Sequence, residues 1–315
     1  MILIVSFADN EHVEEVRQHL TRPHVVVDTA WFPRRLRLAA GTEGDRMSLR
    51  LRDPSFGEVD LSRVGAVWYR RIRPFELHPE VVDEAGRLFA WSECQEAMAG
   101  VWYTLPCYWM NPPLGDEVAQ RKIHQLRLAR EVGLAVPDTM VTNDPAEAER
   151  FIARHGPGHV IRKAFRNIPQ APRQTALVGR DDLRRLAAVR YAPVIFQRFV
   201  PAVADLRVTV VDGDVFATEI RSDADHQVDY RPGLHLARVR AATVPDAVVT
   251  AVHQLMKLLN VSFGAIDMRL TPDGEYVFLE INPAGEYLFV SRRTGQPIPQ
   301  AIAAALERHD AEVAG

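Results

Sequence analysis

The stretch from Ile266 to Tyr287 (IDMRLTPDGEYVFLEINPAGEY) constrains the fold more than any other part of this sequence. Two runs of alternating apolar and polar residues flank a Thr-Pro-Asp-Gly segment, a pattern typical of two antiparallel strands joined by a tight turn. A loop of two or four residues is even in length, and an even loop places Asp267, Glu280 and Asn282 on one face of the hairpin. With the two-residue turn, Asp267 and Glu280 pair directly across the strands.

Asp267, Glu280 and Asn282 together offer two carboxylates and an amide oxygen, the hard ligands that Mg²⁺ takes in proteins. The same pattern fits a half-buried hairpin with a solvated polar face, so the hairpin alone leaves both interpretations open. The segment Asn282-Pro283-Ala284-Gly285 favours the metal site. An apolar-Glu-apolar-Asn-Pro run resembles the metal-binding strand of the ATP-grasp ligases.

Composition excludes several classes of protein. With 315 residues the chain is long enough for two or three domains, and a formal charge of −3 gives no basic surface for nucleic acid. Cys94 and Cys107 fit no metal or redox spacing, so we expect them to pack as small apolar groups in a cytoplasmic protein. The apolar run at residues 1–5 is too short for a signal peptide or a membrane span and predicts a buried strand.

The order of predicted elements indicates separate parts. Residues 1–110 alternate strands with helices and predict a small α/β domain. Prolines at 112 and 113 mark its end. A helix is then predicted from Asp116 to Val132, carrying Lys122, and a strand from Val160 to Ala164, carrying Lys163. Strands mixed with helices, and antiparallel hairpins in the second half, predict an α+β fold for the remainder.

Two arginines, Arg70 and Arg71, directly follow the apolar strand predicted at residues 64–69. They are either a pair of surface arginines or a contact for an anion or carboxylate, since the ends of parallel strands point into crevices. The sequence favours neither interpretation over the other.

An ordered set of polar residues resembles the ATP-grasp superfamily over residues 111–315: Lys122, Lys163, Gln197, Asp205-Leu206-Arg207, Asp267, Glu280 and Asn282. The resemblance implies an ATP-grasp fold, with a central subdomain at 111–190 and a C-terminal subdomain at 191–315 that carries the metal site. It implies ATP and Mg²⁺ as cofactors. The lysines would neutralise nucleotide phosphates as point charges. The nucleotide would also contact the Asp205 side chain and a linker strand that includes Gln197, Phe199 and Val200. Arg207 would stabilise charge on the transferred phosphoryl group.

Within the superfamily the chain is most similar to the microviridin-type graspetide synthetases. The similarity rests on residues 67–71 (VWYRR), 229–231 (DYR) and 282–287 (NPAGEY). It implies an ATP-dependent macrocyclase that links Asp or Glu side chains to Thr, Ser or Lys side chains of a ribosomal precursor peptide with a leader, through an acyl phosphate. It implies neither nucleic acid nor a membrane as partner, and is compatible with a homodimer. The substrate contacts that the resemblance suggests are Arg70, Arg71, Asp223, Asp225, Asp229 and Arg231, with a structural role for Asp229 and Arg231 equally open.

Two other classes remain open at this point. A carboxylate–amine ligase that adds an amino acid to a protein or small molecule shares the ATP site but needs no leader peptide. A nucleotide-binding regulatory module without catalysis fits less well, because the Asp/Glu/Asn set and Arg207 are intact.

The sequence departs from the superfamily pattern in two places. No glycine follows Lys163 until after Leu177, whereas many relatives close a glycine-rich loop over the phosphates. Arg166 and Arg173 are candidates to replace that loop, unless it becomes ordered only when peptide binds. Arg198 also stands where many relatives have glutamate, which puts the ribose contact in doubt.

A second hairpin at residues 206–220 gives a geometric prediction. If Arg207 and Arg221 both reach the phosphates, they must share a face. A three-residue loop, Val211-Asp212-Gly213, pairs Arg207 with Ala217 and aligns the two arginines, whereas a two-residue turn separates them. We therefore expect the three-residue loop.

Overall fold

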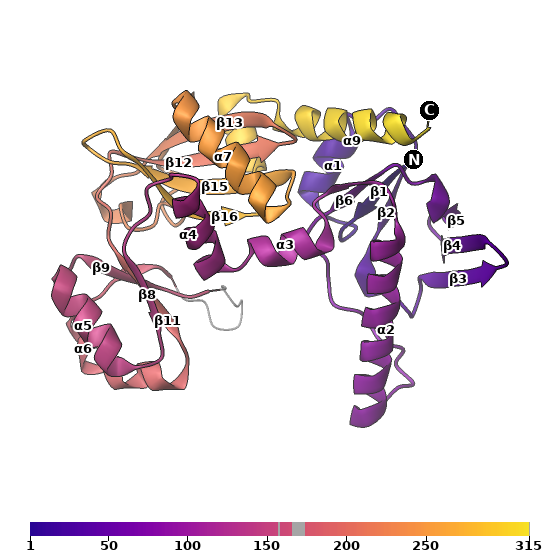
Figure 1. Ribbon diagram of the computed structural model, residues 1–315, viewed down its shortest axis with the longest axis horizontal. Helices are drawn as coiled ribbons and strands as arrows, with labels where there is room; N and C mark the ends of the chain where they lie inside the picture. Colours follow the sequence, from indigo (N-terminus) through magenta and orange to yellow (C-terminus); the bar gives the residue numbers. More distant parts are fainter. Residues whose placement is uncertain (157, 166–173, 315) are drawn as a thin grey trace.

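The computed structural model describes residues 1–156, 158–165 and 174–314 (Figure 1). Its N-terminal part is built on a parallel sheet of order β2-β1-β6-β7, with β1 Ile2–Val5, β2 His24–Val27, β6 Ala66–Tyr69 and β7 Tyr108–Met110. β1 is fully buried, because helices cover both faces of the sheet and a continuous apolar run suits that position.

The two faces of this sheet pack on different parts of the chain. Ile2 and Ile4 face α1 (Glu11–Arg17) and the C-terminal helix α9 (Ile298–Ala314), which contributes Ile298, Ile302 and Leu306. Leu3 and Val5 face α2 (Glu84–Thr104) and an antiparallel ribbon of β3 (Arg37–Glu43), β4 (Arg46–Asp53) and β5 (Gly57–Asp60). The last helix of the chain therefore completes the core of the first domain. Figure 1 shows the two termini close together.

The central sheet has the order β10-β9-β11-β8, with β8 Thr139–Thr142, β9 Val160–Lys163, β10 Ala176–Leu177 and β11 Val194–Arg198. Helices α5 (Pro145–His155) and α6 (Arg180–Arg184) accompany it. β11 pairs with both β8 and β9, so this sheet extends past the subdomain boundary proposed at residue 190. A boundary after Arg198 fits the strand pairing better.

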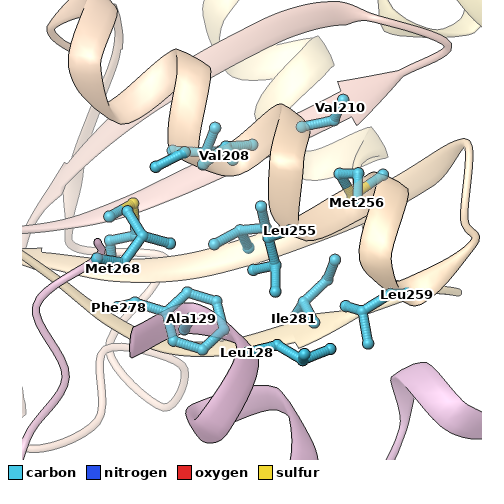
Figure 2. Packing of buried hydrophobic residues seen from close by; sticks show 14 of the residues in the cluster. Leu128, Ala129, Val208, Val210, Leu255, Met256, Leu259, Met268, Phe278 and Ile281 are labelled. Carbon is cyan, nitrogen blue, oxygen red and sulfur yellow. The ribbon is translucent and has the colours of Figure 1, made fainter. Parts of the chain in front are cut away.

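The C-terminal sheet is antiparallel, of order β14-β13-β12-β15-β16. Its strands are β12 Ala204–Val211, β13 Asp214–Arg221, β14 Arg238–Ala242, β15 Phe263–Leu270 and β16 Tyr276–Asn282. Helix α7 (Asp246–Leu259) packs Leu255 and Leu259 against one face of this sheet, together with Leu128 from an earlier helix (Figure 2). The opposite face is apolar at one end, where Val211 and Phe263 join the core beside α9, and carries the polar side chains of Arg207 and Asp267 further along.

The helix predicted from Asp116 to Val132 is wrong as a single element. The chain forms α3 (Pro113–Ala119) and α4 (Lys122–Glu131), with Gln120 and Arg121 between them. Lys122 is consequently the first residue of α4. α4 packs on α7 and β16, which brings Lys122 to the C-terminal sheet rather than to the central one.

Several short elements complete the chain. Helix α8 (Leu288–Thr294), which the sequence pattern did not predict, follows β16 and contacts β14. The 3-10 helices are η1 (Thr29–Trp31), η2 (Leu61–Arg63), η3 (Leu186–Tyr191) and η4 (Ala224–His226). Among the described residues, every helix is too short or too polar to cross a membrane.

Candidate functional site

The hairpin of β15 and β16 brings Asp267 opposite Glu280, as expected, but by a different route. Its loop spans residues 271–275 and is odd in length, so Met268 pairs with Phe278 near the turn. A β-bulge at Leu279 then shifts the register by one residue and restores the Asp267–Glu280 pair. The even loop is therefore wrong. Because of the bulge, Leu279 is only partly buried and lines a cavity beside Glu280.

Asp267, Glu280 and Asn282 converge on one point. The Asn282 amide nitrogen lies 3.2 Å from Glu280 Oε1 and 3.4 Å from Asp267 Oδ2. The nitrogen and oxygen of an amide are assigned from such contacts, so a half-turn of the side chain presents Oδ1 to the same point. Two carboxylates and an amide oxygen are the donor set that Mg²⁺ prefers. No cluster of three or more His, Cys, Asp or Glu side chains that could hold a metal occurs in the described part of the chain.

Two cations neutralise the carboxylates from opposite sides. Arg207, on β12 next to β15, donates from Nη1 to Asp267 Oδ1 at 2.7 Å. Lys122, at the start of α4, lies 2.6 Å from Glu280 Oε2. Arg207 is buried, and a fixed guanidinium in a poorly solvated site stabilises negative charge more strongly than one in water.

The electrostatics of the two carboxyl groups differ. Burial raises the pKa of Asp267, and the contact with Arg207 offsets this only in part. Burial would also raise the pKa of Glu280, but Lys122 and Lys163 outweigh it and hold that pKa at about 2. Burial in turn lowers the pKa of Lys163. Lys122 and Lys163, from different elements, therefore surround Glu280 with positive charge.

The prediction for the second hairpin is wrong. β12 and β13 are joined by the two-residue turn Asp212-Gly213, both with positive φ, and Arg207 pairs with Thr218. Arg221 consequently points to the opposite face, where its guanidinium contacts Glu219 at 2.7 Å. Because the period of a strand is two, this register excludes Arg221 from the site that Arg207 occupies.

A cavity of about 90 Å³ adjoins Lys163 and Glu280. Apolar and backbone groups of the linker after β11 line it, including Phe199 and Val200, and the floor is formed by Met268 and Leu279. The side chain of Gln197 also borders it but donates to Thr139 Oγ1 at 2.8 Å. Charged side chains share this lining with the apolar ones, among them Lys163, Asp205 and Glu280.

Asp205 has a structural partner that the sequence did not predict. Arg269 lies 2.9 Å from Asp205 Oδ1, donates to the Val200 carbonyl at 2.7 Å, and lies over the ring of Phe199. Burial raises the pKa of Asp205 to about 6, although Arg269 opposes that rise. Arg269 thus holds the linker to the sheet. Only its position two residues after Asp267, on the same face of β15, could have indicated this.

A larger cavity of about 1050 Å³ opens between the N-terminal domain and the C-terminal sheet. One wall carries Arg207, Asp267, Glu280 and Asn282, and the opposite wall is aromatic, with Tyr69, Trp91, Trp102 and Tyr103. These aromatic residues could not be assigned to a site from the sequence. They lie on a strand and a helix, where apolar residues are expected to pack in the core.

The residues suggested as substrate contacts divide into three groups: those at the large cavity, those exposed around η4, and Arg70, which is buried. Arg71 and Arg231 line the large cavity, and Asp229 pairs with Arg231 at 2.6 Å. Asp223 caps η4, contacts His226 and is exposed, as is Asp225. The two arginines suggested to replace the glycine-rich phosphate loop, Arg166 and Arg173, lie outside the described residues.

Arg70 fits neither of the two interpretations. Its guanidinium is 1% exposed and donates to the Gly285 carbonyl at 3.0 Å, so it is neither a surface residue nor open to an anion. Arg71 is partly exposed and donates to the Ala284 carbonyl at 3.1 Å.

Comparison with known proteins identifies the family. Residues 1–116 match the family model of the MvdD pre-ATP grasp domain. The macrocyclase MdnB from Microcystis aeruginosa MRC is 32% identical, with a TM-score of 0.82 over 97% of this chain and 98% of that one. The chain belongs to the graspetide-type ATP-grasp ligases. The α+β ATP-grasp fold and the family predicted from the sequence are thereby confirmed.

Two further solved structures resemble this ligase. A Chryseobacterium gregarium RiPP-associated ATP-grasp ligase, in complex with ADP and a leader and core peptide, is 27% identical with a TM-score of 0.88, over 98% of this chain and 96% of that one. The ATP-grasp ligase PsnB, complexed with minimal precursor, Mg and ADP, is 26% identical with a TM-score of 0.79, over 98% and 97%. A search of curated proteins gives no match.

Proposed function

We propose that this ATP-dependent ligase crosslinks a ribosomally made precursor peptide. It joins an Asp or Glu side chain to a Thr, Ser or Lys side chain of the same peptide, as an ester or an amide. The observation that carries the proposal is the wall of the large cavity, where Arg207 and the three oxygen-bearing side chains face a space wide enough for a peptide. The relatives solved with precursor, leader or core peptides support the peptide as substrate.

The chemistry proceeds in two steps. The γ-phosphoryl group of ATP passes to a peptide carboxylate, forming an acyl phosphate and ADP. The hydroxyl or amine then attacks the acyl carbon, the C–O bond to phosphate breaks, and phosphate leaves, so each ring costs the peptide one water. Condensation in water is unfavourable, and the cavity must shield the acyl phosphate from hydrolysis.

We assign the following roles to the residues of this chain. Lys122 and Lys163 bind phosphate charge, and Arg207 stabilises charge on the transferred group. Asp267, Glu280 and Asn282 would hold Mg²⁺, which would supply positive charge to neutralise the phosphates. The linker at Phe199 and Val200 encloses the base, and Gln197 and Asp205 support that linker.

The substrate contacts belong to the same proposal. Arg231 lies in the cavity wall, where it can meet a peptide carboxylate. Arg71 lines the same wall, but its guanidinium is held by the Ala284 carbonyl and Glu286. Asp223 and Asp225 are exposed on the segment that enters this wall, as a contact for a leader requires. A ligase that adds a free amino acid needs no such long cleft, so that alternative is not favoured.

Mass analysis tests the proposal directly. The purified ligase is incubated with ATP, Mg²⁺ and the precursor encoded nearest its gene, with and without the leader segment. We expect the full-length precursor to lose one water per ring and to accelerate ADP formation, because remote contacts assemble the catalytic site. Equal turnover of a leaderless core or a free amino acid would support the small-substrate ligase instead.

A further inference from the structure

The loop directly after Asn282 begins with residues that have no polar side chain. Its first three residues are Pro283, Ala284 and Gly285, so its only hydrogen-bonding groups there are backbone ones. This loop nevertheless connects Asn282 to the residue whose carbonyl Arg207 contacts. Its position therefore affects both the metal-site amide and the catalytic arginine.

Four side chains each hold one of four consecutive carbonyls of this loop. Asn111 Nδ2 donates to Pro283 O at 3.1 Å, Arg71 Nε to Ala284 O at 3.1 Å, Arg70 Nη2 to Gly285 O at 3.0 Å and Arg207 Nη2 to Glu286 O at 2.9 Å. We call these four residues the carbonyl clamp. Arg70 and Arg71 follow β6 in the N-terminal domain. Arg70 lies 215 positions before Gly285, and Arg71 lies 213 positions before Ala284.

The burial of Arg70 removes a charged guanidinium from water, which costs free energy that an apolar side chain would not. Arg70 is 1% exposed, and its Nε and Nη1 have no hydrogen-bond partner among the residues that the structure describes. Its guanidinium lies 5.2 Å from the ring of Tyr287, and the rings of Trp68 and Phe263 are also within 6 Å. An apolar side chain of similar volume would fill this position at lower cost. The cost fits a residue that is needed to hold the loop.

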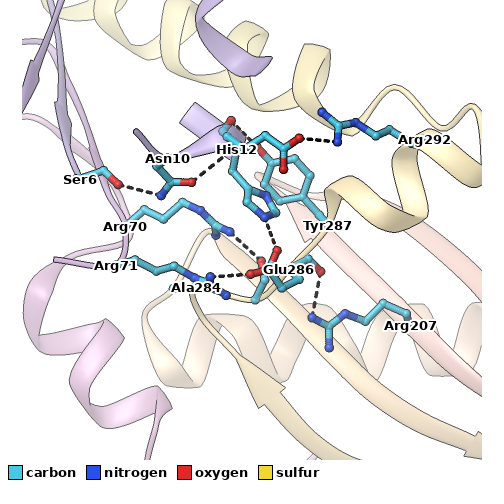
Figure 3. A network of polar contacts seen from close by, with 12 residues as sticks. Ser6, Asn10, His12, Arg70, Arg71, Arg207, Ala284, Glu286, Tyr287 and Arg292 are labelled. Atoms are coloured by element: carbon cyan, nitrogen blue, oxygen red, sulfur yellow. Dashed lines mark hydrogen bonds and ion pairs between the residues drawn. The ribbon is translucent and has the colours of Figure 1, made fainter. Parts of the chain in front are cut away.

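Further contacts fix the end of the loop (Figure 3). Glu286 contacts both His12 of α1 and Arg71, at 2.5 Å from Arg71 Nη1, and Tyr287 donates to the His12 carbonyl at 2.9 Å. Gly285 lies so close to Arg207 that an added Cβ would come within 2.9 Å of Nη2, and within 2.4 Å of the Ala265 side chain. The loop and Arg207 therefore cannot move independently.

We propose that Arg70 and Arg71 are positioning residues. By holding the Gly285 and Ala284 carbonyls, the N-terminal domain fixes the geometry of Asn282 and Arg207 and thereby the rate of phosphoryl transfer. This inference rests on the proposed function for its kinetic readout. It adds that the first domain acts on the chemistry without its arginines touching the reacting atoms.

Arg71→Ala is the sharpest test, because Arg71 is partly exposed and its removal leaves no buried charge unpaired. Arg17→Ala is the matched control: Arg17 of α1 pairs with Glu14, the side chains of Arg71 and Arg17 are 38% and 40% exposed, and their partners are 47% and 48% exposed. We expect Arg71→Ala to lower kcat for precursor-dependent ADP formation about 10- to 100-fold, the effect of a small misplacement, with KM for ATP and for precursor nearly unchanged. Arg17→Ala should match the wild type.

A second readout is independent of turnover. Hydrogen exchange of the segment spanning residues 283–287 should accelerate in Arg71→Ala and not in Arg17→Ala. Unchanged exchange overturns the clamp. A raised precursor KM with normal kcat also overturns it, and makes Arg71 a substrate contact. If the wild type forms no ADP with precursor, the proposed function fails, and the exchange measurement still decides whether the clamp holds the loop.

A double-mutant cycle with Gly285→Ala provides the last check. Gly285→Ala displaces the loop from its own side while leaving the N-terminal arginines intact. If both changes act through one loop position, the double variant should lose no more than the worse single variant. Multiplicative losses would show two separate effects and contradict the proposal.

Discussion

At the scale of single residues, two neighbouring carboxyl groups of the site have pKa values that are shifted in opposite directions. Asp267 and Glu280 face each other across two strands, yet the pKa of Asp267 is raised and that of Glu280 is lowered to about 2. The difference arises because two lysines surround Glu280, whereas Asp267 has Arg207 and the charge of Glu280 itself beside it. Glu280 therefore stays ionised at every physiological pH. It is also largely buried, with 20% of its side chain exposed, so its replacement is not a surface change.

Glu280→Gln should lower ATP turnover about 100- to 1000-fold, the effect of removing one preorganised charged group. Lys122 and Lys163 then face a neutral amide and repel each other, so we also expect a lower melting temperature. Glu275→Gln is the control, since Glu275 is exposed at the turn of the same hairpin. Steady-state ADP formation and circular dichroism measure the two effects. Normal turnover in Glu280→Gln would refute the metal assignment.

Asp116 predicts a pH dependence of stability. Burial raises its pKa to about 6, although a hydrogen bond from Gln120 opposes the rise. A carboxyl group with a raised native pKa binds its proton more tightly when folded. Its contribution to stability is thus complete below the ordinary pKa and is lost as the pH rises through about 6.

Asp116→Asn should remove that loss. We expect the variant to gain up to about 3 kcal/mol over the wild type at pH ~7.5, and little or nothing at pH ~4, since the shift is about two pKa units. Urea unfolding at the two pH values measures the difference. The same gain at both would show that ionisation of Asp116 is not its cause.

At the scale of elements, the two hairpins show what the sequence could and could not predict. Alternation of apolar and polar residues placed Asp267 and Glu280 on one face, but the bulge at Leu279 has no signature in the alternation and was missed. For the second hairpin, Asp212-Gly213 is a strong local signal for a two-residue turn, and the structure has that turn. The three-residue loop was expected only so that Arg221 could reach the phosphates. The residues of the turn itself predicted the loop length better than the assumed role of Arg221 did.

The register of β12 and β13 separates the two arginines in function. Arg221→Ala should leave precursor-dependent ADP formation within about twofold of the wild type, because its partners are Glu219 and solvent. Arg207→Lys keeps the charge but loses the two-pronged contact with Asp267 and the Glu286 carbonyl, and should lose about 100-fold or more in kcat. Equal losses in both variants would restore Arg221 to the site.

At the scale of the whole molecule, packing between distant segments decides what the sequence leaves open. Most elements, the family and the oxygen-rich strand were predictable, since each depends on local pattern or motif; α8 and the division of α3 from α4 were not. The contact of Arg70 with Gly285 and the aromatic wall of the large cavity were not predictable either, because periodicity carries no information on which distant segments meet. The same holds for the packing of α9 on the N-terminal sheet.

Asp310 on α9 is a buried link between the ends of the chain. Its carboxylate contacts Arg22 Nε at 2.5 Å and the Gly65 backbone nitrogen at 3.2 Å. Asp310→Ala should lower the free energy of unfolding by about 3–5 kcal/mol, because it leaves buried donors unpaired. Asp181→Ala, which removes an exposed ion pair, should change it by less than about 1 kcal/mol. Urea unfolding followed by tryptophan fluorescence measures both.

The docking of α9 on β1 and β6 also sets the order of events during synthesis on the ribosome. The strands of the first sheet emerge early, but Ile298, Ile302 and Leu306, which cover one of its faces, are translated long after them. At a rate of about 5–20 residues per second, that face waits roughly 10–50 s for its cover. The nascent chain therefore presents an apolar sheet to chaperones for most of its synthesis, and a product cut short before α9 exposes the same face to cellular proteases.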